Sequence, residues 1–286
     1  GIRAQSIGGG GGNGGSARSL AILLKQGSSK LQEGETMGSN WKLQMVIGGN
    51  GGTAADGGEV VVNNSGMIYT EGACSNGIFA QSVGAGGGAG GDGILGTGTM
   101  ADGPWAIAGL ILEEAGGGGN KIVKTALGMA RDLSLVVGGS QGAHGDAKDV
   151  TVTNSGTILT KGNASIGILA QSVGGGGGLA RSFAQSEDST GKAVIGATGK
   201  CGIGGSGGAG GDAGAVTVTN SARIDTYGDG AHGIEAQSVG GGGGIAGNVD
   251  RCLADVFGFA GIGLGLAIGG DGGAGGNGGA VSVTST

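Results

Sequence analysis

The chain has 286 residues, of which 80 are Gly and only 1 is Pro. Collagen is excluded because its triple helix needs Gly at every third position together with abundant Pro. Full disorder is disfavoured because 37% of the residues are hydrophobic and the Val, Ile and Leu residues are clustered. The net charge of −6, with 15 basic residues spread thinly, predicts that the chain binds no nucleic acid. Its apolar runs, such as 105–112, are too short to cross a membrane, so we expect no membrane insertion by this segment.

The chain opens on a motif, GIRAQS, that runs directly into a tract of Gly and then recurs. The four copies begin at Gly1, Gly77, Gly167 and Gly233, and their Gln residues are Gln5, Gln81, Gln171 and Gln237. Upstream of the last three copies the match extends without gaps over 60–82, 150–172 and 216–238, and a further copy begins at Val281. The unit starts at 60, 150, 216 and 281, so the spacings are 90, 66 and 65 residues. A constant unit of 23 residues with variable segments between its copies is typical of repeat architectures.

Within the unit, apolar residues alternate with polar ones, as in VTVT at 150–153, which predicts short strands with one buried face. Asn-Ser-Gly at 154–156 and Lys-Gly-Asn at 161–163 supply bends between the strands. We therefore expect each 23-residue unit to form one coil of a parallel β-solenoid whose coils stack about 4.8 Å apart. An antiparallel sandwich would need turns such as Asn-Gly at the strand joints, and Asn-Ser-Gly or Asn-Ser-Ala stands there instead.

In such a solenoid the equivalent residues of each unit lie on neighbouring parallel strands. Val152, Ile158, Ile168 and their counterparts should then be buried. The asparagines that begin each bend, Asn64, Asn154 and Asn220, should stack as a ladder in the turns, and the four Gln residues should form an amide ladder along one edge.

Between the units the chain follows one order: a Gly tract, a variable segment, a short apolar strand and a second Gly-rich run. The variable segments lie near 16–40, 93–131, 180–192 and 247–261, and they hold most of the charge and bulk, including Trp41, Pro104, Trp105 and Arg181. The returning strands are predicted at Leu43–Ile47, Leu133–Val137, Ala193–Ile195 and Gly263–Ile268. We expect these strands to lie in further coils, about three coils to each long repeat. The variable segments should be surface excursions from the scaffold, so that removal of 93–131 leaves the rest of the fold intact.

The Gly-rich runs have a period of three, as in the four Gly-Gly-X triplets of 269–280. A period of three is typical of an extended polyglycine helix with three residues per turn, and such helices can form bundles. The alternative is a set of flat, Gly-lined strands that stack tightly in the solenoid. We favour strands, since the neighbouring segments are strands.

The pattern VTVTNSGTI, followed by GI-x-AQSVGGGGG, resembles the passenger regions of large glycine-rich bacterial autotransporter proteins. The resemblance covers all four copies and leaves the variable segments unmatched. It implies an all-β fold, a right-handed parallel β-helix, which forms after export through an outer-membrane β-barrel. It therefore implies a location at the bacterial cell surface or outside the cell.

Several motifs resemble catalytic or metal-binding sites without their context. Gly204–Gly208 matches a nucleophile elbow around Ser206, but that motif needs a strand-to-helix turn and an acid–His pair. The histidines are His144 and His232, and His232 stands where Asn76 and Ile166 stand in the sister copies. The run 87–95 matches one calcium-binding nonapeptide, and one isolated copy cannot complete a shell of six to eight oxygens. Cys74 aligns with Ala164 and Gly230, which indicates a site for a small side chain.

We expect this chain to have no enzymatic activity and to bind no cofactor and no metal. The function we favour is structural and adhesive, with self-association, attachment or the formation of biofilms or filaments; a partner would be a second copy, bound end to end or laterally, or a host or abiotic surface. The alternative is an inert stalk or spacer for an enzyme or toxin domain that lies elsewhere in the same passenger. The Gln ladder is expected to be structural, with binding of glycans or ice-like surfaces as the lesser possibility. The uncapped coils at both ends, together with only 13% charged residues, predict association of the isolated chain.

Overall fold

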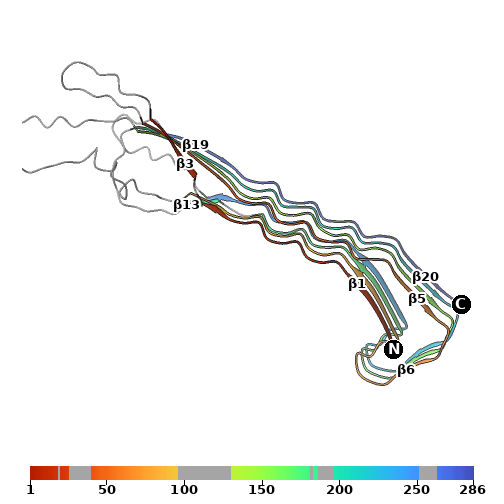
Figure 1. The fold of residues 1–286 in the computed structure, drawn as a ribbon. Coiled ribbons are helices and arrows are strands. Elements are labelled where there is room, and N and C mark those ends of the chain that lie inside the picture. The colour runs from red at the N-terminus through yellow and green to blue at the C-terminus, as the bar shows by residue number, and fades with distance from the viewer. Residues whose placement is uncertain (19, 26–39, 96–129, 181–182, 186–195, 251–262) are drawn as a thin grey trace, which may run out of the picture.

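The computed structural model describes residues 1–18, 20–25, 40–95, 130–180, 183–185, 196–250 and 263–286. These residues form strands and connecting segments and contain no helix, and so no helix that could cross a membrane. The chain runs from one end of an elongated body to the other and back, and repeats this course with each long repeat (Figure 1). We call each such circuit a pass. The near end is the one that holds both termini and β6, and the far end is the opposite one.

Three parallel sheets form the near end, and each pass adds one strand to each sheet. The first contains β1 (Ile2–Ile7), β7 (Ile78–Val83), β12 (Ile168–Val173) and β17 (Ile234–Val239). The second contains β5 (Val60–Asn64), β10 (Val150–Asn154), β15 (Val216–Asn220) and β20 (Val281–Ser285). The third contains β6 (Ile68–Thr70), β11 (Ile158–Thr160) and β16 (Ile224–Thr226). Val150 pairs with Val60 on one side and Val216 on the other, so the predicted parallel pairing of equivalent residues is confirmed.

Aliphatic side chains fill the space between the near-end sheets. Val152, Ile158 and Ile168 are fully buried, as predicted. Among their counterparts, Val62, Ile68, Ile78 and Val218 are at most 7% exposed. The prediction is wrong at the two ends of the stack, where Ile2, Ile224 and Ile234 are partly buried and Val283 is 48% exposed, because no described pass covers them on one side. One cluster joins the buried residues among these with the buried alanines of β7 and β12. Burial of each Val or Ile side chain contributes about 1.5–3 kcal/mol to stability relative to an exposed one. This cluster is therefore the hydrophobic core of the near end.

Between the near and far ends, the chain forms two glycine-rich legs in each pass. The outgoing legs are 8–16, 84–92, 174–180 and 240–248, and the return legs are 48–59, 138–149, 204–215 and 269–280. Their backbone hydrogen bonds recur at every third residue. Gly8, Gly11 and Gly14 donate to the carbonyls of Val83, Gly86 and Ala89 in the next pass, at 2.8–3.1 Å. The same legs also bond to the return legs, which run in the opposite direction: Gly49, Gly52 and Ala55 donate to Gly15, Gly12 and Gly9.

The prediction that these runs are strands is wrong for the legs as described, which contain no strand and only one isolated parallel bridge, between Leu179 and Ile245. In a strand successive residues point to opposite sides, with a period of two. In the legs the partner changes with a period of three, because each residue of a Gly-Gly-X triplet faces a different neighbour. The period of three in the sequence therefore indicated the structure of the legs correctly, and the strands next to them did not.

The legs approach one another so closely that a side chain would not fit. A Cβ atom added to Gly142 would lie 1.7 Å from the carbonyl oxygen of Gly52, and one added to Gly88 would lie 1.9 Å from that of Gly12. Both neighbours are backbone atoms that are themselves hydrogen-bonded, so neither can move aside cheaply. The high Gly content is thus a consequence of backbone packed directly on backbone.

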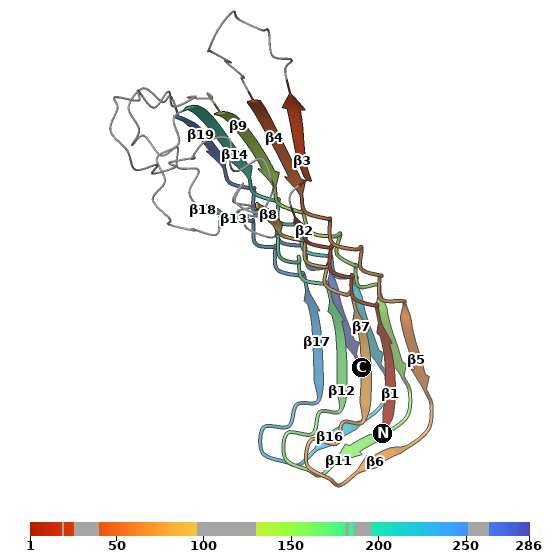
Figure 2. The ribbon, with the colours of Figure 1, turned by 60° about the vertical axis from the view of Figure 1, so that its left-hand side comes forward.

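Two further sheets form the far end. The smaller contains β2 (Ala17–Arg18), β8 (Gly93–Leu95), β13 (Phe183–Gln185) and β18 (Val249–Asp250). The larger contains β4 (Asn40–Ile47), β9 (Ala130–Val137), β14 (Gly196–Ile203) and β19 (Gly263–Ile268) in parallel. Its last strand, β3 (Leu20–Lys25), pairs antiparallel with β4 and covers that edge (Figure 2). Three of the predicted returning strands lie within β4, β9 and β19, whereas Ala193–Ile195 lies outside the described residues and the strand of that pass is β14.

The expectation of about three coils to each long repeat is wrong, since one long repeat makes a single pass. Ile78 of β7 pairs with Ile168 of β12, 90 residues later, and no strand lies between them in that sheet. The 23-residue unit forms the three near-end strands and turns the chain around. The legs then carry the chain to the far end and back before it can stack on itself.

Candidate functional site

The four Gln residues of the repeated motif form the predicted amide ladder on the outer face of the first near-end sheet. The Nε2 of Gln5 donates to Oε1 of Gln81 at 2.6 Å, Gln81 to Gln171 at 3.1 Å, and Gln171 to Gln237 at 3.0 Å. At the end of the row, Gln237 donates to Glu235 at 2.9 Å. The amides are thus committed to one another along the stack, and the ladder keeps the side chains of successive passes in register.

A second amide ladder lies at the bend of the near end, where the sequence predicted it. Asn64 donates through Nδ2 to Oδ1 of Asn154, and Asn154 donates to Asn220, both at 2.7 Å. Each Asn also donates to the carbonyl two residues ahead, which closes the bend of its own pass. Asn154 is 1% exposed and its bonds to Gly156 and Asn220 are buried, whereas the bonds of Asn64 at the first pass are partly open to water.

A column of serines, of which Ser82 and Ser172 are fully buried and Ser238 is partly buried, joins the first near-end sheet to the return legs. The sequence interpretation missed this column. Ser172 donates to the carbonyl of Lys148 at 3.0 Å and accepts the N–H of Gly214 at 2.8 Å. Ser238 makes the equivalent pair of bonds with Gly214 and Gly279. The signal was present in the sequence, because Ser follows Gln in all four copies of the motif.

The Gly residues that open the motif are required for two reasons of packing. A Cβ atom on Gly167 would lie 2.5 Å from both the carbonyl oxygen of Gly233 and the side chain of Ile224. Gly77 meets the corresponding atoms of Gly167 and Ile158 at 2.6 Å, and Gly1 would meet the carbonyl of Asn76 at 2.4 Å. Gly233 faces open space because no described residue stacks on that side. These glycines therefore allow one pass to stack on the next.

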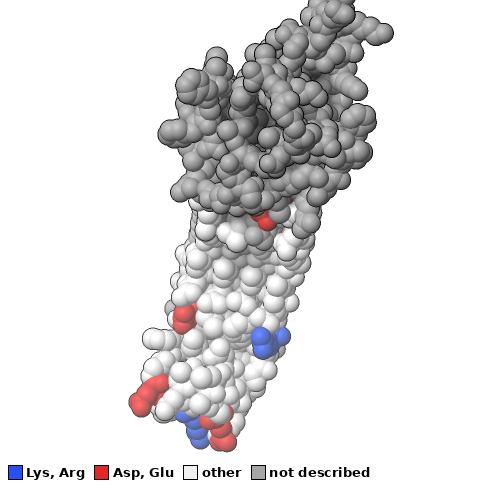
Figure 3. All heavy atoms as spheres, turned by 90° about the vertical axis from the view of Figure 1, so that its left-hand side faces the viewer, with Lys and Arg blue, Asp and Glu red and all other residues white. Residues whose placement is uncertain are grey.

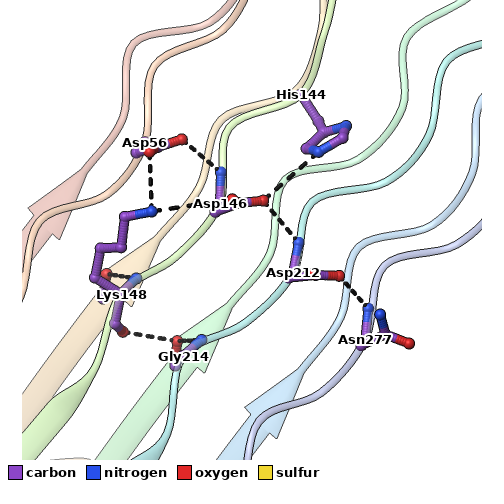
Figure 4. A network of polar contacts seen from close by, with 9 residues as sticks. Asp56, His144, Asp146, Lys148, Asp212, Gly214 and Asn277 are labelled. Atoms are coloured by element: carbon purple, nitrogen blue, oxygen red, sulfur yellow. Dashed lines mark hydrogen bonds and ion pairs between the residues drawn. The ribbon is translucent and has the colours of Figure 1, made fainter.

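Asp56, Asp146 and Asp212 stack along the outer face of the return legs (Figure 4). The N–H of Asp146 donates to Asp56 at 2.9 Å, that of Asp212 to Asp146 at 2.9 Å, and that of Asn277 to Asp212 at 2.6 Å. The ammonium of Lys148 lies 2.9 Å from Asp56 and 3.9 Å from Asp146. We call these carboxylates and Asn277 the aspartate column.

The cation and the backbone donors stabilise the charged form of Asp56. The N–H of Asp146, followed by the ammonium of Lys148, lowers the pKa of Asp56 below its ordinary value. The hydrogen bond to Asp56 in turn raises the pKa of Lys148. Both side chains are about half exposed, at 51% and 45%, so solvent screens this pair.

The residues that resembled a catalytic site are not brought together. Ser206 lies in a return leg, where its N–H donates to Ser140 Oγ at 3.4 Å, and the elbow motif's strand-to-helix turn is absent from this described segment. His144 contacts Asp146 at 3.6 Å and the carbonyl of Ala209 at 2.7 Å. His232 is exposed at the near end and its carbonyl accepts the N–H of Gly167. Among the described residues, no three His, Cys, Asp or Glu side chains gather closely enough to hold a metal ion.

Cys74 lies in a near-end turn at a backbone conformation that favours Gly. Its φ is 55°, and its equivalents Ala164 and Gly230 have φ of 51° and 66°. In this left-handed region a Cβ atom approaches the following carbonyl, which costs about 1–2 kcal/mol. The preference for a small residue at this position, predicted from the alignment of the three copies, therefore has a backbone cause.

The variable segments lie largely outside the described residues, and so do Trp105, Pro104 and Arg181. The predicted bounds of all four segments are too wide, because strands of the far-end sheets fall inside them. These strands are β2 and β3 in 16–40, β8 and the start of β9 in 93–131, β13 in 180–192 and β18 in 247–261. The flanking strands of all passes stack in the two far-end sheets. The described strands on either side of each variable segment therefore lie at the same end of the body.

Charged side chains are few on the described surface, as Figure 3 shows for the view onto the far end.

No family model, no curated protein and no solved structure matches this chain.

Proposed function

We propose that this chain is a rigid structural and adhesive section of a protein exported to the bacterial surface, and that it associates with further copies of itself. In its finer form the proposal is a right-handed parallel β-helix whose legs are polyglycine-like bundles. The similarity of the repeats to glycine-rich autotransporter passengers supports both export and handedness. A host or abiotic surface is the other class of partner that such a section would meet.

One observation carries the structural role: successive passes are hydrogen-bonded in register along the whole described length. The bonds continue from the near-end sheets through the legs to the far-end sheets without a change of register. A pass whose backbone is hydrogen-bonded to the passes on both sides of it resists local opening and proteolysis. Such a body transmits force along its legs and holds the far-end segments at a fixed distance from the near end.

The outgoing legs present an uncharged face that favours self-association. Its apolar members come from the last two passes: Leu179 is 50% exposed, Val239 48% and Ile245 65%. Between the two rows that hold these side chains runs a row of exposed glycines, of which Gly176 and Gly242 have open space where a Cβ would stand. Exposed aliphatic side chains on a surface with few charges gain free energy when a second apolar surface covers them.

Sedimentation velocity of the purified chain, from low to high micromolar concentration, tests this proposal. We expect the wild-type chain to associate and the variant Leu179→Lys/Ile245→Lys to remain monomeric, because two ammonium groups on each copy would have to be buried. Thr219→Lys adds the same kind of charge to the sheet that continues the return legs and is the matched control. A wild-type chain that stays monomeric at high concentration would favour the alternative of an inert spacer.

Display of the chain on bacterial cells tests the adhesive half. Cells that carry the wild-type section should settle together faster than cells that carry the double Lys variant. If the purified chain associates but the cells do not settle, association belongs to the isolated section and adhesion is rejected.

A further inference from the structure

The aspartate column differs between passes in one respect, the presence of a cation. Lys148 contributes the only ammonium that contacts the column among the described residues, and the equivalents of Lys148 in the other passes are Gly58, Gly214 and Gly279. Asp56 and Asp146 therefore have an ionic partner, whereas Asp212 accepts the N–H of Asn277 and has no ion pair with a cation of the described residues.

Each of the first two carboxylates also bonds to the backbone of the following pass. Asp56 accepts the N–H of Asp146 through Oδ1 and the ammonium of Lys148 through Oδ2, both at 2.9 Å. Lys148 and Asp146 belong to the same pass, so Asp56 ties the first return leg to the second at two points. Asp146 then accepts the N–H of Asp212 and so reaches the third return leg.

His144 adds one contact from the second return leg to the third. Its Nδ1 lies 2.7 Å from the carbonyl of Ala209, which makes Nδ1 the donor, and its Nε2 faces Asp146 at 3.6 Å. The remaining charged group in this surrounding is Asp149, which acts on Lys148 and accepts the N–H of Ala215.

We propose that Asp56, Lys148 and Asp146, with His144 beside them, form an acid-sensitive clasp whose carboxylates hold the first three return legs together. The carboxylates must be ionised to accept both a cation and a backbone N–H, and charge-assisted bonds of this kind are stronger than neutral ones. Protonation removes the ionic contact and weakens the backbone bond at the same site. The clasp lies on the outer face of the legs, away from the apolar cluster of the near end, so its opening loosens the legs and leaves that cluster intact.

The direction of the pH dependence follows from Asp56 and Lys148. The pKa of Asp56 is lowered in the folded chain, so its contribution is present above the pKa of an unfolded Asp, about 3.9, and is lost as the pH falls below it. The pKa of Lys148 is raised, so its contribution is present below the pKa of an unfolded Lys, about 10.4, and is lost as the pH rises above it. The clasp is closed between these limits and opens in acid.

Hydrogen exchange of the Asp146 amide, expressed as protection relative to the intrinsic rate at each pH, measures the clasp directly. The measurement uses the full chain in a His144→Asn background, which removes the imidazole beside Asp146 and leaves Asp56 and Lys148 in place. Between pH 5 and pH 3 we expect the protection of this amide to fall about two- to fivefold, the range that an exposed ion pair provides. The amide of Gly276, which donates to Gly241 in the last pass, should keep its protection and reports on the fold.

Two isosteric variants make the test specific. Asp56→Asn keeps an oxygen for the Asp146 amide but loses the ion pair, so most of the fall in protection should already be present at pH 5. Asp212 lies in the same column but has no ion pair, so Asp212→Asn should leave the pH response of the Asp146 amide's protection unchanged. The proposal is overturned if the two variants give the same protection at Asp146, or if Asp56→Asn keeps the full response to acid.

Salt separates the ionic contact from the hydrogen bond. At pH 5, 1 M sodium chloride shortens the screening length to about 3 Å, so it should lower the protection of the Asp146 amide in the chain that retains Asp56 and have little effect in Asp56→Asn. An equal effect of salt in both chains would also overturn the proposal.

Discussion

The near end and the legs of this molecule are built from the same stacked passes but are stabilised in different ways. At the near end, side chains such as Ile78 and Ile168 fill the space between sheets and are removed from water. In the legs the space between layers is closed by backbone alone, since a Cβ on Gly142 would overlap the carbonyl of Gly52. The near end therefore depends on side-chain volume, and the legs depend on the absence of side chains.

Removal of volume from the near end should have the largest effect. Ile168 is fully buried, and Ile168→Ala should lower the free energy of unfolding by about 2–5 kcal/mol, through lost burial and the cavity that remains. Urea unfolding followed by circular dichroism measures the change. Ile7→Ala, at a side chain that is 64% exposed in the same sheet, is the control and should change stability by less than about 0.5 kcal/mol. Equal losses in the two variants would contradict the assignment of the core.

Addition of volume to the legs should have the next largest effect. Gly142→Ala should cost about 1–3 kcal/mol or more, because the new methyl group meets hydrogen-bonded backbone on the neighbouring leg. Gly176→Ala adds the same methyl group where nothing lies within 4 Å, and it should be neutral or stabilise the chain by about 0.4–1 kcal/mol. The two unfolding curves, compared under the same conditions, decide whether close packing of backbone governs the legs. If both variants lose stability equally, the loss comes from a backbone conformation that only Gly adopts easily, and not from the close packing at Gly142.

The two amide ladders sharpen the comparison between buried and exposed polar groups. Asn154→Ala leaves the amides of Asn64 and Asn220 without their partner in a buried site, so we expect a loss of about 1–3 kcal/mol. Gln171→Ala interrupts the outer ladder, where water can replace the lost bonds, and should change stability by no more than about 0.5 kcal/mol. Thermal or urea unfolding of the two variants measures the difference. A larger loss for Gln171→Ala would show that the outer ladder carries the register.

The smallest expected effect is a gain at the near-end turn. Ala164 has a φ of 51°, so Ala164→Gly relieves about 1–2 kcal/mol of strain and costs about 0.5–1 kcal/mol of chain entropy. The net result should be a stabilisation of up to about 1.5 kcal/mol. The unfolding midpoint in urea checks it, with Ala170→Gly, at a fully buried strand position, as a destabilising control. A lower midpoint for Ala164→Gly would show that the turn tolerates the side chain without strain.

Much of the near end could be predicted from residues that repeat. The alternation of Val150 and Val152 with threonines identified a strand with one buried face, and the equal lengths of the 23-residue units placed Ile168 beside Ile78 and Ile234. Parallel, in-register stacking follows from such equality, because each residue then meets its own kind. The Asn and Gln ladders follow for the same reason.

The pairing partner of each Gly could not be predicted in this way. A Gly-Gly-X triplet is compatible with a strand or with a three-residue helix, since Gly has no side chain whose burial would distinguish a period of two from a period of three. The serine column was missed for a related reason. Ser172 bonds to Lys148 and Gly214, which lie in return legs of two different passes, and no local pattern marks such partners.

The sequence by itself determined the all-β class, the repeat, the buried face of the near-end strands and the residues of both ladders. These properties depend on local alternation and on identity between copies, and both can be read along one chain. Only the tertiary structure decided the path of a pass, the period of the legs and the position of Asp56 beside Lys148 of the next pass. These properties depend on which backbone lies against which, and in glycine-rich chain that choice is made by hydrogen bonds between segments far apart in the sequence.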